Sequence, residues 1–201
     1  MTQPGAVCQS LPVDLQQWIA DDHASVLARF EKGIGIKVPT TRWKDDGSGT
    51  SIAWLLFHTT LHQDLALNTA IRNHAPLLDQ HREALGIAEF PTSAGLSETE
   101  DRAVVEAMHI PALHTYVQAV NAATATWISN ISIMALDSVP NAGWRLEHKA
   151  GVPADGEYSW LHAMWADKPV SWFVQWECIG HGHTHVGEMV GVRNRLGFGG
   201  F

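Results

Sequence analysis

The chain has 201 residues, of which 45% are hydrophobic and 17% are charged, and its formal net charge is −8. This length and apolar content suit a single globular domain spanning residues 1–201. The acidic balance, without a cluster of Lys and Arg, excludes a protein that grips a nucleic-acid backbone, because such binding needs a concentrated basic face. No apolar run approaches the ~18 residues that cross a bilayer, which excludes a membrane-spanning protein.

The first residues and the cysteines indicate the compartment. Residues 1–10 lack the basic start and the apolar stretch of a signal peptide, so we expect a cytoplasmic protein. The two cysteines, Cys8 and Cys178, cannot make a disulfide framework, and no C-x-x-C pair offers a thiolate clamp for a metal.

The first half of the chain predicts two helices separated by a loop. Apolar residues at helical spacing predict a helix that Pro12 opens and that ends near Lys32. Residues 33–49 are rich in Gly and include two consecutive aspartates, which is typical of a loop. A second helix is predicted to begin at Thr50 or Ser51, either of which can cap it.

This second helix runs to about Asn73 and carries two histidines. On a helical wheel His58 lies within the apolar stripe, and His62 lies at the edge of that stripe. We therefore expect His58 to face the core.

The middle of the chain predicts a connecting segment and then a long third helix. Residues 74–85 are expected to hold a short helix, and residues 86–95 a loop. The run Ser-Glu-Thr-Glu at 97–100 matches a capping box, so a helix is expected to start there. Continued to Leu136, that helix would be about 60 Å long. A break is therefore expected near 109–111, with the long third helix starting at Pro111.

The last third predicts an excursion and then a fourth helix. Residues 137–158 are rich in Pro, Gly and charge, as in loops that form lids or site walls, and residues 159–166 suit one short helical turn. Pro169 suits the first turn of a helix that ends near Leu196. Its interior glycines each cost about 1 kcal/mol against alanine, which indicates a close helix neighbour or a local distortion. These glycines are Gly180, Gly182, Gly187 and Gly191.

No stretch alternates with the period of two that marks a strand, so the chain is predicted to be all-α. Four principal helices make a four-helix bundle the simplest fold, with a long excursion before the last helix. The outer side of that helix carries Trp172 and Trp176. We expect this side to pack against a second subunit in a homodimer or, failing that, beneath residues 137–168.

The fourth helix contains the sequence His-Gly-His-Thr-His-Val-Gly-Glu from His181 to Glu188. Residues four apart lie ~40° apart around a helix and about one turn apart along it, so the imidazoles of His181 and His185 can converge on one ion. Glu188 follows on the same face. His183 is two residues from each of the other histidines and points away from them.

Bundles hold metals between facing helices, and His58 on the second helix can complete a set with His181 and His185. Three imidazoles and one open position are the usual plan of a catalytic metal site, in which bound water becomes a nucleophile. Glu188 can hydrogen-bond the second ring nitrogen of a ligand or act as a catalytic proton acceptor.

Packing offers a simpler explanation for some of these residues. A lone histidine on an apolar face, such as His58, is more often a hydrogen-bonded core residue. His62 can be a group behind the ligands, an alternative ligand or a half-buried residue. Cys178 suits a small core position. The H-x-x-x-H pair on a buried, glycine-rich helix is harder to explain by packing.

Two stretches resemble motifs of the DinB-like superfamily, four-helix-bundle proteins that include mycothiol-dependent maleylpyruvate isomerase and bacillithiol-linked transferases. They are Trp54-Leu-Leu-Phe-His58 followed by Asp64, and His181-x-x-x-His185-x-Gly-Glu188. The resemblance covers most of the chain. It implies a metal triad of His58, His181 and His185, a divalent zinc, nickel, iron or manganese ion, and often a dimer. The choice of His58 over His62 rests partly on it.

The leading hypothesis is a metal-dependent enzyme with a small-molecule substrate, either a thiol-dependent transferase or isomerase, with mycothiol as candidate co-substrate, or a hydrolase. The alternative is a non-catalytic metal- or ligand-binding bundle, such as a stress-associated sensor or store. A fourth protein ligand, for example His62 or Cys178, would favour the alternative because it would close the site.

Overall fold

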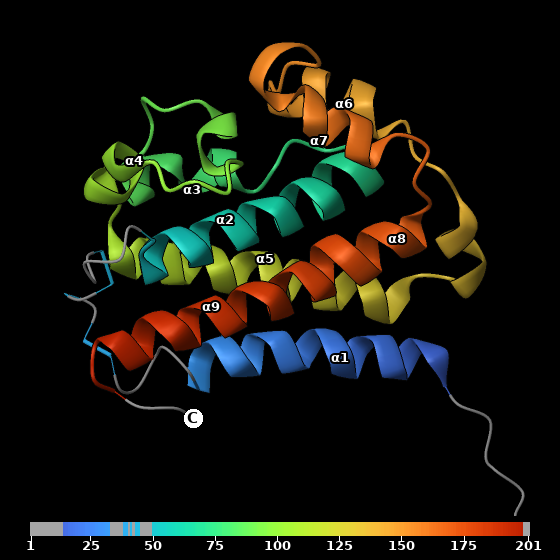
Figure 1. The fold of residues 1–201 in the computed structure, drawn as a ribbon. Helices are drawn as coiled ribbons and strands as arrows, with labels where there is room; N and C mark the ends of the chain where they lie inside the picture. Colours follow the sequence, from blue (N-terminus) through green and yellow to red (C-terminus); the bar gives the residue numbers. More distant parts are fainter. Residues whose placement is uncertain (1–13, 33–37, 40, 42, 45–49, 199–201) are drawn as a thin grey trace, which may run out of the picture.

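The computed structural model describes residues 14–32, 38–39, 41, 43–44 and 50–198, and every regular element among them is helical. Four long helical segments form the body of the fold (Figure 1). They are α1 (Leu15–Phe30), α2 (Ile52–Asp64), α5 (Ile110–Asn130) and the pair α8 (Val170–Gln175) and α9 (His181–Arg195). The predicted all-α bundle is confirmed. Most of the predicted 33–49 loop, and Cys8, lie outside the described residues.

The bundle has a cyclic order in which α2 packs against α5 and α9, and α1 packs against the same two helices. Two of the helices continue through π-helical segments. The segment η3 (Leu65–Ile71) extends α2, and η7 (Trp176–Gly180) joins α8 to α9. Together they give the two long helices that the periodicity predicts. Ser51 caps α2, since its side chain accepts a hydrogen bond from the Trp54 amide.

The glycines of the fourth helix have different explanations. A Cβ at Gly182 would lie 2.5 Å from Cγ1 of Val26 on α1, so this glycine permits close packing of two helices. Gly180 ends the π-helical segment directly before α9. At Gly187 there is space for a side chain. The predicted close neighbour and the predicted distortion are therefore both present, one turn or less from His181.

The predicted capping box is wrong. The helix after it is α4 (Arg102–Ala107), and Asp101 caps it by accepting from the amides of its second and third residues. The Ser97 hydroxyl accepts instead from the Thr99 amide, and the Glu100 carboxylate accepts from the Ser51 amide before α2. Glu100 thus stabilises the start of a different helix, and this tertiary contact displaces the local cap.

The predicted break at 109–111 is confirmed, since Met108 and His109 are extended and α5 begins at Ile110. The third helix ends earlier than predicted, at Asn130. Ile131 and Ser132 are extended, and a short 3-10 helix, η5 (Ile133–Asp137), follows.

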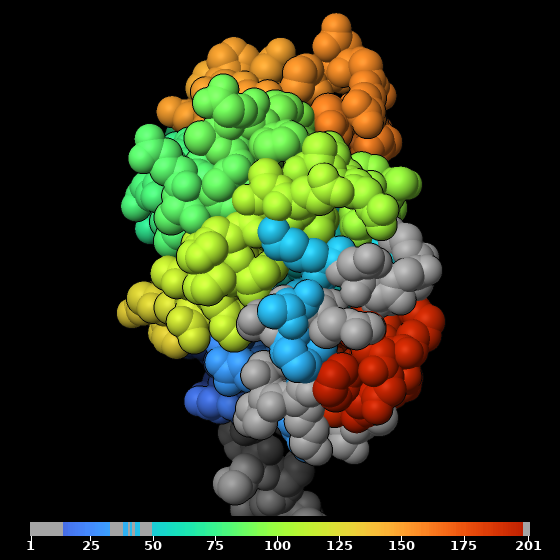
Figure 2. Space-filling model, turned by 90° about the vertical axis from the view of Figure 1, so that its left-hand side faces the viewer, coloured from blue at the N-terminus to red at the C-terminus, as the bar shows by residue number. Residues whose placement is uncertain are grey.

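The excursion between α5 and α8 is more helical than its composition indicates. It holds α6 (Ala142–Ala150), the 3-10 turn η6 (Gly156–Tyr158) and α7 (Ser159–Trp165), which form a cap over η3 (Figure 1). Arg145 anchors α6, because its guanidinium donates to the carbonyls of Ala70 and Ile71 at the end of η3. Seen from the end of the molecule at which α9 finishes, the segment from α3 to the start of α5 lies between this cap and α9 (Figure 2).

The remaining elements connect α2 to α5. They are α3 (Leu78–Leu85) and the 3-10 turn η4 (Thr92–Gly95). On the outer side of the fourth helix Trp172 is partly buried and Trp176 is 40% exposed, and the homodimer stays a prediction. None of the helices in the described part of the chain has the length and hydropathy needed to cross a membrane.

Candidate metal centre

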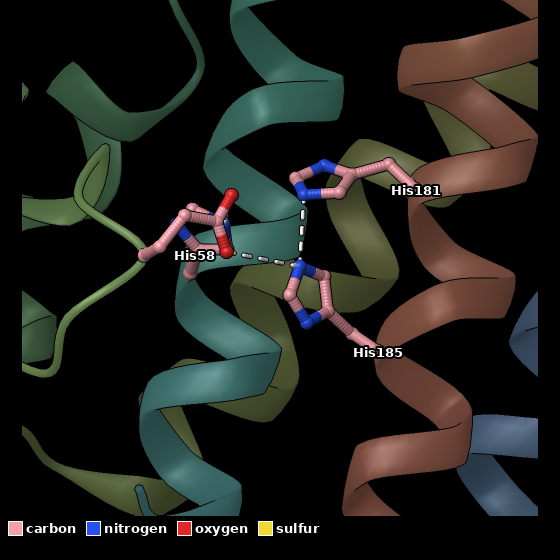
Figure 3. Close-up of side chains that lie close together, drawn as sticks. His58, His181 and His185 are labelled. Atoms are coloured by element: carbon pink, nitrogen blue, oxygen red, sulfur yellow. Dashed lines mark hydrogen bonds and ion pairs between the residues drawn. The ribbon is translucent and has the colours of Figure 1, made fainter.

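Three histidines meet at the interface of α2 and α9. His58 projects from α2 toward His181 and His185 on α9, and all three are at most 5% exposed (Figure 3). The ring of His58 lies 5.1 Å from that of His181 and 5.0 Å from that of His185, measured between centroids. The Nε2 atoms of His181 and His185 are 2.8 Å apart. The structure thus brings the predicted triad together.

The outward-facing ring nitrogens have acceptors that set which nitrogen carries the proton. Nδ1 of His58 donates to the Gly95 carbonyl at 2.8 Å, and Nδ1 of His185 lies 3.0 Å from the Glu188 carboxylate. Since a carbonyl or carboxylate only accepts, both rings keep an unprotonated Nε2 directed into the site. Metal-bound histidines commonly donate their second nitrogen in this way.

The surroundings favour the neutral form of two of these imidazoles, those of His58 and His181. Burial lowers the pKa of both His58 and His181, and the neighbouring His62 lowers both further. Neutral imidazole is the form that ligates metals. Moreover, Nε2 of His58 is buried and has no hydrogen-bond partner within the described part of the chain. A lone pair without a donor in such a place fits a cation better than it fits a packed core.

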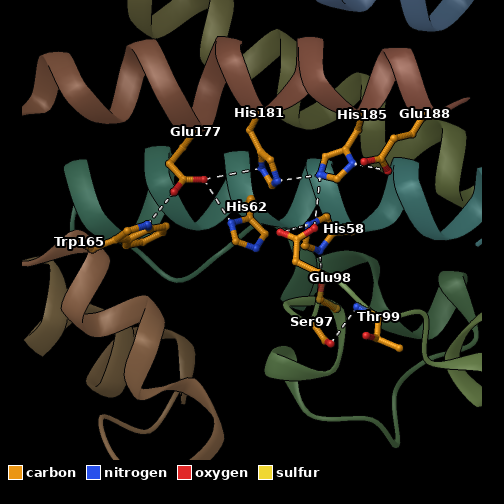
Figure 4. Close-up of polar contacts among 11 residues, drawn as sticks. His58, His62, Ser97, Glu98, Thr99, Trp165, Glu177, His181, His185 and Glu188 are labelled. Carbon is orange, nitrogen blue, oxygen red and sulfur yellow. Dashed lines mark hydrogen bonds and ion pairs between the residues drawn. The ribbon is translucent and has the colours of Figure 1, made fainter.

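Glu98 is a fourth donor that the sequence did not single out. Its carboxylate oxygens lie 3.6 Å from Nε2 of His58 and 4.0 Å from Nε2 of His185 (Figure 4). The neighbouring His58 ring is the main cause that lowers the Glu98 pKa. The four ligand atoms lie within 4.8 Å of one another, an arrangement that can hold a metal ion. Glu98 is on the non-helical segment before α4, and its side chain is 69% exposed.

A second acidic residue, Glu177, lies on the inner side of the site and is 1% exposed. One of its oxygens accepts from Nε1 of Trp165 at 2.7 Å, and the other lies 3.2 Å from Nδ1 of His62 (Figure 4). Glu177 precedes His181 by four residues, the spacing that also relates His181 to His185. That repeat was present in the sequence as a signal, whereas no spacing relates Glu98 to the histidines.

The other predicted residues have defined places. Glu188 contacts Nδ1 of His185, which matches its predicted hydrogen bond to a ligand; its role as a proton acceptor stays a prediction. His62 is 2% exposed, so the half-buried alternative is wrong. His183 points away, toward Asp22 on α1 at 3.2 Å. Cys178 is buried outside the converging donors, and burial raises the pKa of its thiol.

Comparison with known proteins supports the fold alone. No family model matches the chain, and no curated protein matches it. Among solved structures, the crystal structure of a conserved protein from Enterococcus faecalis is similar, with a TM-score of 0.63 and 18% sequence identity. The match covers 92% of this chain and 98% of that one. At this identity the chain shares the fold of that protein, and the chemistry must be argued from the site.

Proposed function

We propose that the protein is a divalent-metal-dependent enzyme whose ion is held by Nε2 of His58, His181 and His185. The observation that supports it best is the Nε2 atom of His58, which is buried without a hydrogen-bond partner among the described residues and faces two further imidazoles. Leaving a buried acceptor unpaired costs about 1–3 kcal/mol. A cation bound to this nitrogen would offset that cost.

The donor set fits the proposed ions. Three imidazoles with one carboxylate suit zinc, nickel, iron or manganese, and the helices fix the imidazoles before any ion arrives. When bound, such an ion polarises a substrate oxygen or stabilises a thiolate. The carbonyl of Gly95 and the carboxylate of Glu188 orient two of the rings through their Nδ1 atoms.

Glu98 supports an enzyme because it is the one exposed donor, on a segment without helical hydrogen bonds. A small substrate that displaces this carboxylate would reach the ion from solvent. The proposed reactions are thiol-dependent transfer or isomerisation, and hydrolysis. The resemblance to the DinB-like superfamily supports mycothiol as a candidate thiol.

The same residue gives weight to a second candidate, a non-catalytic metal store or sensor. If Glu98 stays bound, four protein donors surround the ion and substrates are excluded. The two functions therefore differ in whether an external ligand replaces Glu98.

Cobalt-substituted protein tests this difference. Addition of 2-mercaptoethanol should produce a thiolate-to-cobalt absorption band in an enzyme, and Glu98→Ala should bind the thiol more tightly. A store should show no band in wild type. His185→Ala should lose this ion, whereas His183→Ala, a neighbour that points away, should keep it. If the wild-type protein binds none of zinc, nickel, iron and manganese, both functions are refuted.

Turnover separates the two functions further. Thiol-transfer and hydrolytic substrates can be screened with and without mycothiol, comparing wild type with His185→Ala. Metal-dependent turnover supports the enzyme. Its absence, together with no thiolate band, supports the store.

A further inference from the structure

A second group of potential ligands lies deeper in the bundle, beside the first. Nδ1 of His62, Oε2 of Glu177 and Nδ1 of His181 lie within 4.8 Å of one another. We infer that a second divalent ion binds to these three atoms at the same time as the first, so that His181 bridges two ions. This inference rests on the proposed function, because the first ion uses the opposite nitrogen of the same ring.

The distances suit ligands that share an ion. Oε2 of Glu177 lies 3.2 Å from Nδ1 of His62, which is a hydrogen-bond distance in the metal-free protein, and 3.8 Å from Nδ1 of His181. Two donors bound at about 2.0–2.1 Å to one ion are roughly 3–3.5 Å apart. If Glu177 only oriented His181, a hydrogen bond of about 2.7–3.2 Å would be expected instead. The 3.8 Å separation between Glu177 and His181 is too long for a hydrogen bond, and a small shift of the side chains would let both atoms bind one ion.

The protonation pattern also favours a cation here. The 2.8 Å contact between the Nε2 atoms of His181 and His185 requires a proton, and His185 carries its own proton on Nδ1, next to Glu188. The neutral His181 ring therefore supplies that proton from Nε2, and its Nδ1 is an acceptor. This Nδ1 is buried, has no hydrogen-bond partner in the described residues and faces the Glu177 carboxylate. Two acceptors that face each other repel unless a cation lies between them.

The charge and burial of Glu177 also favour a bound cation. Glu177 is 1% exposed, and its ion-pair partners among the described residues are His62 and His181. A carboxylate removed from water is costly unless it is paired. Trp165 fixes one oxygen, so the other is directed between the two histidines (Figure 4).

Binding both ions releases a proton from the His181 ring to solvent, as metal binding to protonated ligands does. The resulting imidazolate, with Glu98 and Glu177, supplies three negative charges against the four positive charges of two divalent ions. Mixed imidazole and carboxylate ligands suit zinc and copper.

Metal stoichiometry of the whole protein tests the inference. Metal-free protein titrated with Zn²⁺, desalted and subjected to elemental analysis should retain two ions per chain. His62→Ala and Glu177→Gln should each retain one ion, and so should His58→Ala. The matched control His183→Ala, on the same helix, should retain two.

Copper provides a readout of the bridge itself. With one equivalent of Cu²⁺ the protein should give an ordinary electron paramagnetic resonance signal. A second equivalent should diminish it, because two copper ions joined through one imidazolate couple antiferromagnetically. In Glu177→Gln the signal should persist after the second equivalent. This variant keeps the size of the side chain and an acceptor for Trp165, so it tests the bridge even if His62→Ala fails to fold.

The possible failures are distinguishable. One zinc ion in wild type, lost with His58→Ala and kept with His62→Ala and Glu177→Gln, would overturn the second site and leave the proposed function standing. Two ions in wild type and in both of those variants would also overturn it. No bound metal under any condition would overturn both proposals.

Discussion

Helix α2 buries two groups of polar side chains that differ in how completely they are hydrogen-bonded. Asp64 and Gln63 belong to a closed group. Asp64 accepts from the amides of Leu77 and Leu78, from the Tyr116 hydroxyl and from Asn68. His58 and His62 belong to an open group, in which each ring has an Nε2 atom with no partner among the described residues.

Gln63 extends the closed group across three helices. Its amide nitrogen donates to Nε2 of His23 on α1 at 3.0 Å and to the Thr124 hydroxyl on α5 at 2.8 Å. A closed group stabilises the fold, because every buried donor finds an acceptor. An open group costs free energy in the metal-free protein, and the proposed metal binding would recover it. Asp64 and Gln63 thus help to hold the bundle, whereas the open atoms of His58 and His62 face the proposed site. Trp54 and Thr59 on the same helix also bury polar atoms without partners among the described residues, and they belong to neither group.

The largest expected effect comes from breaking the closed group at Asp64. Asp64→Ala leaves the Tyr116 hydroxyl and the amides of Leu77 and Leu78 without their acceptor, so the free energy of unfolding should fall by about 3–5 kcal/mol. Urea unfolding of metal-free protein measures this loss. Asp64→Asn, which keeps the size and one acceptor oxygen, should lose less. Equal urea midpoints for wild type and Asp64→Ala would show that the group does not hold the fold.

The closed group should also make stability depend on pH through His23. Burial lowers the pKa of His23 from 6.5 to about 4. Between these values the unfolded chain binds more protons than the folded one, so the free energy of unfolding falls as the pH drops from about 6.5 to about 4. The fall attributable to His23 is about 3 kcal/mol.

The measurement is urea unfolding of metal-free protein at several pH values, compared with His23→Gln. His58 and His181 also have lowered pKa values and remain in both proteins, so the difference between the two curves isolates His23. Parallel curves would mean that His23 does not titrate in this range.

The periodicity of the sequence was enough to predict the helices that carry the closed and open groups. It also placed His58 toward the core and put His181 and His185 on one face, because these relations depend on helical geometry within one element. Whether the three rings hold a metal stays a prediction.

Features that depend on contacts between elements were not predictable in this way. Glu98 follows Gly95, which packs so closely on α2 that a Cβ there would lie 2.5 Å from Phe57, and this contact between elements has no signal in the local sequence. Asp101 replaces the predicted cap of α4, while Glu100 accepts across the fold from the Ser51 amide before α2. The sequence did not predict helix α6, because its anchor is the hydrogen bond from Arg145 to the Ile71 carbonyl of η3, 74 residues away in sequence.

His181 on α9, which faces the open group and has an unpartnered Nδ1 among the described residues, is expected to respond differently to substitution. In metal-free protein His181→Leu removes a ring with an unpaired Nδ1 but also the hydrogen bond of that ring to His185, so the two effects should largely cancel and the free energy of unfolding should change by less than about 1 kcal/mol. The stabilisation by added zinc should disappear. In wild type that stabilisation is about 2.7 kcal/mol at a free zinc concentration one hundred times the dissociation constant.

Thermal unfolding with and without zinc measures both quantities. A large loss of stability in metal-free His181→Leu would place His181 with the structural residues. Zinc stabilisation that persists in the variant would remove His181 from the site.

The smallest expected effect concerns Glu188, which stands at the edge of the open group with a half-exposed side chain. It contacts Nδ1 of His185, on the opposite side of that ring from Nε2, so Glu188 contacts a proposed ligand and not the proposed position of the ion. Supporting residues of this kind change metal affinity by about 10- to 100-fold when removed. Glu188→Gln keeps an acceptor for Nδ1 and should weaken zinc binding about tenfold or less, while Glu188→Ala should weaken it more. Competition with a zinc-chelating dye measures both affinities.

If Glu188 instead acts as the catalytic proton acceptor, Glu188→Gln should keep wild-type zinc affinity and lose about 10²- to 10⁴-fold in turnover. The ratio of the loss in affinity to the loss in turnover therefore decides between the two roles.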